Sequence, residues 1–274
     1  VGVMVLLRRM FPHDPKFVLA GTFAYAFLPP AFSNQIEAAG LAESLGSLAL
    51  VVFFYTLFQY RNISCIKHSL WVGLGLGLCV LSSPGSAIGA ALVSILFGLE
   101  ILLKHKFNSR IFLELLLAAI TGLVISAPFW ASVLINHGRG FFITPVIGQY
   151  NSQSGKQGYL LATILQLLNF QLVQDGSYFF WNLFIFLGFL WVVIHGEFSL
   201  PLAFLGLFSI PRENVWLTAL PASILFAYGI TRVILPLIQP LTQFRNLANR
   251  ISLTTLLVFF CSWMTIGSFG LNLA

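Results

Sequence analysis

Charged residues are scarce in this chain, because Lys, Arg, Asp and Glu together make up only 8% of its 274 residues. Water-soluble domains carry roughly a quarter of their residues as charged side chains. This composition therefore excludes an ordinary soluble domain. Hydrophobic residues make up 58% of the chain, and they gather in apolar runs of about 20 residues, which is long enough to cross a bilayer. A transmembrane barrel would show short alternating segments instead.

Cysteine is also scarce, with three in the whole chain. Cys79 and Cys261 lie inside apolar runs and Cys65 lies near Lys67, so the spacing suggests neither a disulfide framework nor a metal site. An initiator Met and a signal-peptide layout are both missing at the start, where Val1 opens in the middle of an apolar stretch. We therefore expect a fragment or a processed chain that lacks an N-terminal part.

The apolar runs predict an all-α fold: a polytopic transmembrane helix bundle of about nine or ten membrane segments, forming a single domain over residues 1–274. The predicted segments are Val1–Leu7, Phe17–Phe32, Leu41–Tyr60, Ser69–Leu81, Gly85–Leu103, Ile111–Ile135, Tyr178–Ile194, Leu200–Ile210, Val215–Leu235 and Ile251–Gly270. A long, partly polar loop at 136–177 interrupts them. Its leucines have helical spacing over Tyr159–Val173, which predicts a helix lying on the membrane interface.

The basic residues predict how the bundle is oriented. The net charge is +6, and the Lys and Arg residues lie between apolar runs, which indicates an anionic membrane surface as partner and no nucleic acid. When successive predicted segments cross the membrane in alternating directions, most Lys and Arg residues fall on one side, namely Arg8, Arg9, Lys16, Arg61, Lys67, Lys104, Lys106, Arg110, Arg232, Arg245 and Arg250. Because cytoplasmic loops are enriched in Lys and Arg, this side is predicted to be cytoplasmic. The protein is then a multi-pass membrane protein of a bacterial or archaeal-type plasma membrane, with its active face outward.

Two groups of residues have a structural explanation. Glu100 and Glu114 each have a basic residue four positions away, Lys104 and Arg110, so we expect ion pairs at the inner ends of their helices. The glycines at 73, 75 and 77 superficially resemble a nucleotide-binding loop, but they lie inside a membrane segment with no preceding strand. Close helix packing is the favoured interpretation.

The outward face receives the residues that could carry chemistry: Glu37, Glu43, His137, Arg139, Lys156 and Arg212. Glu43 opens an apolar helix, where a carboxylate either complements the helix dipole or faces a water-filled cavity. Arg212 follows Pro211 in a polar island, which is either a hydrated turn or a cation placed to hold a phosphate. The same two interpretations stand for Arg139 and Lys156, with a solvated loop favoured for Lys156.

Four stretches occur in an order that resembles the GT-C superfamily of membrane glycosyltransferases, and in particular its protein O-mannosyltransferase and aminoarabinose transferase branch. They are ESLGSLALVVFFY (Glu43–Tyr55), LGLGLCVLSSPGSAIGAALVSIL (Leu74–Leu96), APFWASVLINHGRGFF (Ala127–Phe142) and PRENVWLTALPASILFAYGI (Pro211–Ile230). The resemblance runs through most of the chain and depends on the order of these stretches more than on any single motif. The family often has Lys or His at the proline break, where this chain has Ser82 and Ser83.

The resemblance implies transfer of a sugar from a polyprenyl-phosphate carrier to an acceptor on the extracytoplasmic face. The family's principal catalytic acid lies in a first outer loop, which would precede Val1. Glu43, with Glu37 in the same loop, would then assist catalysis by positioning substrates or holding a divalent metal ion. Arg139, Arg212, His137 and Lys156 would bind the substrate, with the cations neutralising charge on the leaving phosphate. A transporter or flippase for a lipid or polar solute, and a non-catalytic membrane subunit, remain alternatives.

Overall fold

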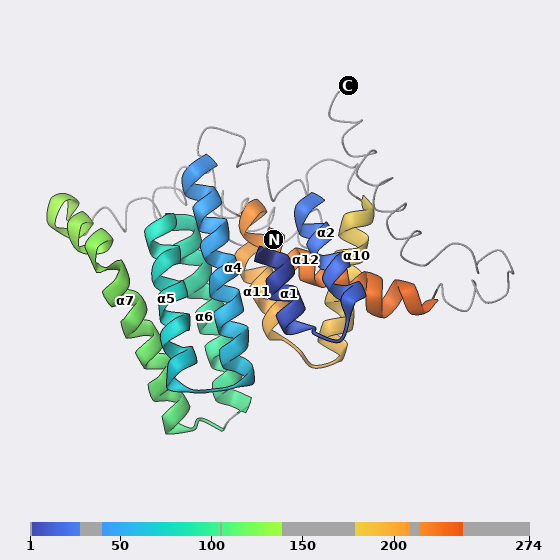
Figure 1. Ribbon diagram of the computed structural model, residues 1–274, viewed down its shortest axis with the longest axis horizontal. Helices are drawn as coiled ribbons and strands as arrows, with labels where there is room; N and C mark the ends of the chain where they lie inside the picture. Colours follow the sequence, from blue (N-terminus) through green and yellow to red (C-terminus); the bar gives the residue numbers. More distant parts are fainter. Residues whose placement is uncertain (1, 28–39, 105, 139–178, 209–213, 238–274) are drawn as a thin grey trace, which may run out of the picture. The chain divides into compact units, whose positions relative to one another are not determined.

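The structure is a computed structural model that describes residues 2–27, 40–104, 106–138, 179–208 and 214–237. Every regular element in these ranges is a helix (Figure 1). The helices are α1 (Gly2–Met10), α2 (Pro15–Phe27), α4 (Gly40–Asn62), α5 (Ile66–Ser82), α6 (Pro84–Lys104), α7 (Ser109–His137), α10 (Phe179–Ile194), α11 (Ser199–Phe208), α12 (Asn214–Tyr228) and the π-helix η3 (Gly229–Ile234). The all-α prediction is confirmed for this part of the chain.

The chain divides into two compact units, which we describe separately. Unit 1 contains α1, α2, α10, most of α12 and η3, whereas unit 2 contains α4, α5, α6 and α7. Helix α11 and the first turn of α12 carry the points at which the chain passes from one unit to the other. Each helix of unit 2 begins and ends within one turn of its predicted membrane segment, because the polar residues that bound each apolar run also form the turns.

In unit 2, α5 packs against both α4 and α7, antiparallel to α4 and parallel to α7. The glycines of α5 permit this close packing. A Cβ atom on Gly75 would lie 2.9 Å from the Cα of Phe53 in α4, and one on Gly73 would lie 2.5 Å from the carbonyl oxygen of Ala118 in α7. Gly77 is equally restricted by Ile125 of α7. The packing interpretation of these glycines is therefore confirmed.

Helix α7 continues through Pro128 and, like the predicted segment Ile111–Ile135, runs well beyond it. Proline removes one backbone donor and leaves a carbonyl without its helical partner. Near this site Ser126 donates its hydroxyl to the carbonyl of Gly122 at 2.8 Å, and the indole of Trp130 donates to the carbonyl of Leu123 at 3.0 Å. These side-chain hydrogen bonds lie on both sides of the proline, where the helix continues. Helix α7 ends before Gly138, whose φ of 68° lies in the left-handed region that favours glycine.

In unit 1 two glycines bring α10 into backbone contact with the end of α12 and η3. A Cβ on Gly188 would lie 1.7 Å from the carbonyl oxygen of Leu225, and one on Gly229 would lie 2.0 Å from the carbonyl oxygen of Phe184. Neither position has room for a side chain. In the same segment, Tyr228 stacks on Trp191 of α10, with 5.2 Å between ring centroids, and forms an edge contact with Phe17 of α2 at 4.8 Å. These contacts hold α2, α10 and η3 together.

Among the described residues, three helices are long and apolar enough to cross a membrane: Gly85–Lys104, Ser109–Asn136 and Leu217–Leu237. Three shorter apolar helices accompany them, of which α11 has only 10 residues and so spans about half of a bilayer core at 1.5 Å per residue. Large apolar side chains of α7 stay exposed, such as Leu113 at 61% and Val124 at 65%, as expected for a face turned to lipid. The predicted interfacial helix Tyr159–Val173 and the segment Ile251–Gly270 lie outside the described residues.

The glycine contact between α10 and the end of α12 can be tested by substitution. We expect Gly188→Ala to lower the free energy of unfolding by about 1–3 kcal/mol or more, because the added methyl group must separate two backbones. Gly98→Ala in α6 is the matched control, since its Cβ would meet only the Leu115 Cδ1 atom, at 3.9 Å. That change should be neutral or stabilise the helix by up to about 1 kcal/mol. Thermal unfolding in detergent measures both, and equal midpoints for the two variants would contradict the packing.

Candidate functional site

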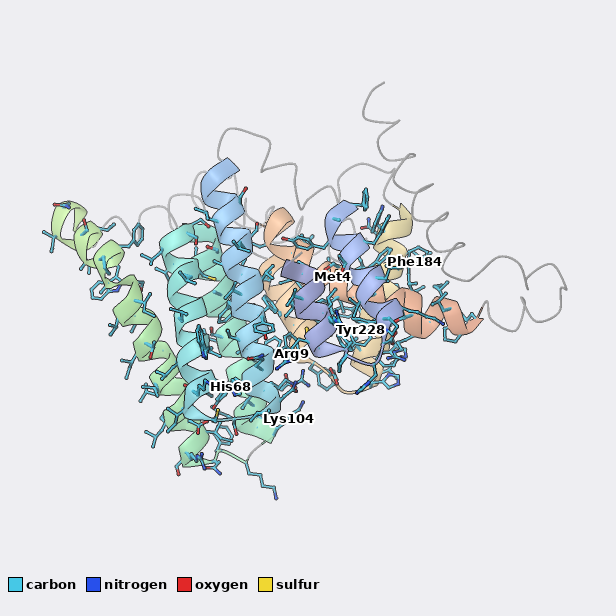
Figure 2. The ribbon with its side chains drawn as sticks, in the orientation of Figure 1. Met4, Arg9, His68, Lys104, Phe184 and Tyr228 are labelled. Atoms are coloured by element: carbon cyan, nitrogen blue, oxygen red, sulfur yellow. The ribbon has the colours of Figure 1, made fainter. Side chains whose placement is uncertain are left out.

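One end of unit 2 carries a cluster of charged side chains, which we call the charged end. Its members are Arg61 at the end of α4, Glu100 and Lys104 at the end of α6, and Arg110 and Glu114 at the start of α7. Both predicted pairs form, with 2.5 Å between Lys104 Nζ and Glu100 and 3.1 Å between Arg110 Nε and Glu114. Arg61 adds a contact between helices, with its Nη2 atom 3.4 Å from Glu100. His68 and Lys104 mark this end in Figure 2.

Glu114 is the buried acid of the charged end, with only 3% of the residue exposed. The hydroxyl of Tyr60 donates to its Oε2 atom at 3.0 Å, and Arg110, whose side chain is 73% exposed, donates to Oε1. The hydroxyl of Ser69 donates to the Glu114 backbone carbonyl. A buried carboxylate is tolerated when its oxygens are hydrogen-bonded and a cation lies beside it. Glu114 therefore links α4, α5 and α7. The predicted ion pair with Arg110 forms, but only the arginine side chain reaches water, while the carboxylate is buried.

At the opposite end of unit 2, α5 turns into α6 through a hydroxyl-rich segment, Ser82–Ser86, which we call the serine turn. Ser83 accepts a hydrogen bond from the Ser86 backbone at 3.1 Å and so caps α6, where Pro84 is the first residue. The Ser86 hydroxyl donates to the carbonyl of Cys79 at 2.7 Å, which satisfies the last turn of α5. All these polar groups are used in shaping the turn.

The first turns of α4 approach the serine turn closely. A Cβ on Gly46 would lie 2.9 Å from the Ser83 hydroxyl oxygen and 3.2 Å from that of Ser86. Glu43 belongs to α4 one turn before Gly46. Since α7 runs antiparallel to α4, its last residue, His137, belongs to this same end of the unit. The described Lys and Arg residues of unit 2, in contrast, all belong to the charged end or to the turns beside it.

In unit 1 the basic residues also gather at one end. Arg232, in the π-helix η3, lies 2.9 Å from the carboxylate of Asp14. The other oxygen of Asp14 accepts from the Phe17 backbone and caps α2. This ion pair joins Arg232 to the turn between α1 and α2, where Arg8, Arg9 and Lys16 occur. The predicted topology places Arg8, Arg9, Lys16 and Arg232 on the same side of the membrane. Within unit 1 these four residues do lie at one end.

Most predicted site residues fall outside this description. Glu37, Arg139, Lys156 and Arg212 lie outside the described residues, and for Glu43 and His137 the structure places only the backbone, in α4 and α7. Their roles remain predictions, as does a metal ion at Glu43. Within the ranges that are described, no group of three His, Cys, Asp or Glu side chains is arranged to hold a metal.

Sequence analysis missed the contacts that join distant parts of the chain. Tyr60 and Glu114 are 54 residues apart, and Asp14 precedes α2 whereas Arg232 lies in η3. Spacing of three or four residues identifies partners on one helix, but it carries no signal for partners on different helices. The one available clue was that Tyr60, Ser69 and Glu114 all occur near predicted cytoplasmic helix ends. Comparisons with protein-family models, curated proteins and solved structures found no match for this chain.

Removal of the tyrosine hydroxyl tests the link through Glu114. We expect Tyr60→Phe to destabilise the protein by about 1–3 kcal/mol, because a buried carboxylate oxygen loses its donor. Tyr55→Phe on the same helix is the matched control, since the Tyr55 hydroxyl accepts only from Gln59 one turn away, at 2.7 Å. Its loss should stay within about 0.5 kcal/mol. Thermal unfolding in detergent gives both values, and a Tyr60→Phe midpoint equal to that of the control would show that Glu114 does not depend on this bond.

Proposed function

We propose that the protein is an integral-membrane glycosyltransferase of the GT-C type, which transfers a sugar from a polyprenyl-phosphate donor to an acceptor on the extracytoplasmic face. The proposal includes a bundle of about nine or ten membrane segments, as the apolar runs predict, with the loop at 136–177 on the outer side. It is supported by the order of the four stretches that resemble this superfamily. It is also supported by unit 2, in which the described Lys and Arg residues lie at or beside the charged end and the uncharged serine turn lies at the opposite end.

The observation on which the proposal depends is the contact between Gly46 of α4 and the serine turn. The resemblance has an acid that opens one helix and a proline break between the next two helices. In this fold the corresponding segments, the first turns of α4 and the turn before Pro84, pack together at the end opposite the charged end. The contact between these two segments, which are distant in the sequence, supports the proposal that they contribute to one site.

The proposed chemistry divides the work between an acid and several cations. Glu43, with Glu37 nearby in sequence, would position the acceptor or hold a divalent ion beside the donor. Arg139, Arg212 and Lys156 would neutralise the phosphate as the bond between sugar and phosphate breaks, and His137 would contact the sugar or phosphate. Positive side chains stabilise a phosphate leaving group most strongly in a site that excludes bulk water.

An assay in proteoliposomes tests this function with a polyprenyl-phosphate donor that carries a radiolabelled sugar. We expect Arg212→Ala to weaken donor binding about tenfold, as for a lost charge-assisted hydrogen bond of roughly 1.5 kcal/mol. Glu43→Gln should retain donor binding but lower sugar transfer by about 100-fold, because a small misplacement of the acceptor can cost that much in rate.

The control is Glu197→Gln, which makes the same acid-to-amide change in the turn between α10 and α11. It should bind and consume the donor like the parent protein. If folded Arg212→Ala and Glu43→Gln variants both behave like this control, the site assignment is wrong. If the parent protein does not consume the donor but moves a labelled lipid or solute across the vesicle membrane, the transporter alternative replaces the transferase.

A further inference from the structure

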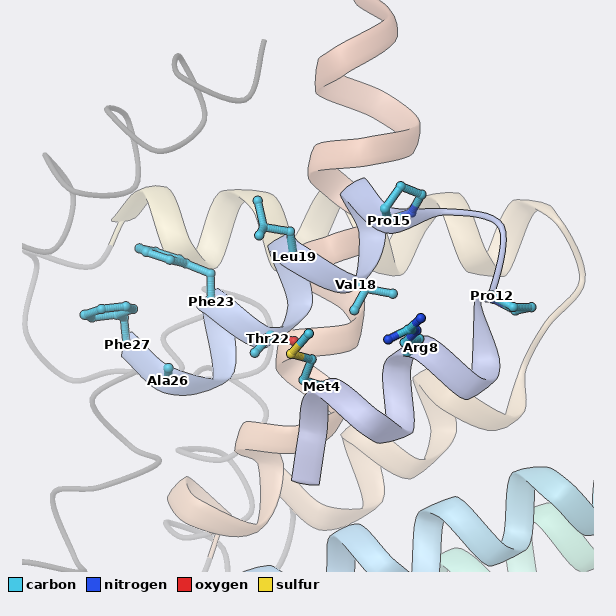
Figure 3. A pocket seen from close by; sticks show the side chains of 10 residues that line it. All are labelled: Met4, Arg8, Pro12, Pro15, Val18, Leu19, Thr22, Phe23, Ala26 and Phe27. Atoms are coloured by element: carbon cyan, nitrogen blue, oxygen red, sulfur yellow. The ribbon is translucent and has the colours of Figure 1, made fainter. Parts of the chain in front are cut away.

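Helices α1 and α2 enclose an apolar groove in unit 1 with a cavity volume of about 720 Å³. This volume lies within the range of about 300–1,000 Å³ that is usual for ligand sites. Figure 3 shows Met4 and Arg8 on α1 and Leu19, Phe23 and Phe27 on α2 beside this groove. Thr22 is the polar uncharged side chain of the lining, and Arg8 is its charged member.

Arg8 distinguishes the groove from a plain apolar surface. It lies in the last turn of α1, close to the turn that leads into α2, and is exposed. Among the described residues it has no acidic partner, whereas Arg232 in the same unit is paired with Asp14. Arg9, His13 and Lys16 are also exposed around this turn. One end of the groove is therefore strongly positive, and the arginine fork suits the oxygens of a phosphate group.

The length of the groove fits one leaflet of a bilayer. Its lining on α2 extends from Pro15 to Phe27, and 12 steps of 1.5 Å give about 18 Å. Half of a bilayer hydrocarbon core measures about 15 Å. An acyl chain that starts beside Arg8 would therefore reach Phe27 near the bilayer midplane. Leu19 and Phe27 are 48% and 37% exposed, so the groove presents apolar side chains along this path.

We propose that the groove between α1 and α2 binds an anionic membrane phospholipid, with its phosphate on Arg8 and one acyl chain along Leu19, Thr22 and Phe23. The charge of the turn selects the anionic headgroup, and the apolar lining holds the chain. By the positive-inside prediction this lipid belongs to the cytoplasmic leaflet, whose anionic lipids attract basic residues near the membrane. The site is separate from the proposed outward sugar-transfer site and does not depend on it.

Native mass spectrometry of the full chain in a non-ionic detergent tests the proposal, with phosphatidylglycerol and phosphatidylcholine titrated separately. We expect the parent protein to bind phosphatidylglycerol more tightly than phosphatidylcholine. Arg8→Gln should weaken phosphatidylglycerol binding about fivefold, the effect of one basic residue beside an anionic lipid, and leave phosphatidylcholine binding unchanged. Arg9→Gln is the matched control, because Arg9 is exposed in the same turn but does not line the groove.

A second variant tests the acyl-chain part of the groove. Leu19→Trp places a larger side chain in the cavity and should weaken binding of both lipids to a similar extent while thermal unfolding stays unchanged. The proposal is overturned if the parent protein shows no preference for phosphatidylglycerol, or if Arg9→Gln lowers the affinity as much as Arg8→Gln. It is also overturned if Leu19→Trp retains full lipid binding, which would mean that the groove is filled by another part of the chain or by a protein partner.

Discussion

Close approach of helix backbones at glycine is the constraint on which both units depend. Between lipid-facing helices the hydrophobic effect supplies little attraction, since lipid tails are as apolar as the side chains, so packing contacts and polar links must hold helices together. In unit 2, α5 contacts α4 through Gly75 and α7 through Gly73 and Gly77. In unit 1 the backbones of α10 and α12 meet at Gly188 and Gly229. Because glycine has no side chain, the neighbouring backbone can approach closely at these positions. These contacts determine where the helices lie within each unit.

Polar groups complete the arrangement at the helix ends. At the charged end of unit 2, Arg61 joins α4 to α6 through Glu100, and Glu114 joins α7 to α4 and α5 through Tyr60 and Ser69. The Asp14–Arg232 pair likewise joins the turn before α2 to η3 in unit 1. These charges have partners within their own unit and so have a structural role. Arg8 differs because it faces an apolar groove with no described acidic partner, which leaves its charge available to a ligand. The serine turn carries no charge and leaves the other end of unit 2 for the predicted outward chemistry.

The helices were largely predictable, and the reasons differ between elements. Apolar runs bounded by Arg61, Lys104 or Asn108 predicted α4, α6 and the start of α7, because charged and capping residues stop or start a helix where the chain meets water. The predicted segment Ile111–Ile135 already continued beyond Pro128, but only the structure shows the side-chain hydrogen bonds from Ser126 and Trp130 that accompany the helix there. The site itself was predicted by resemblance, and its residues Glu37, Arg139, Lys156 and Arg212 lie outside the described ranges.

The sequence alone determined that the chain is helical and apolar, where most helices begin and end, and which pairs at four-residue spacing form, because these properties depend on neighbours along the chain. Only the tertiary structure decided that Glu114 is buried under Tyr60, that Arg232 reaches Asp14 and that α1 and α2 leave a groove beside Arg8. Such contacts depend on how helix faces meet across many intervening residues, and hydrophobic periodicity does not specify which of the available apolar faces will pair.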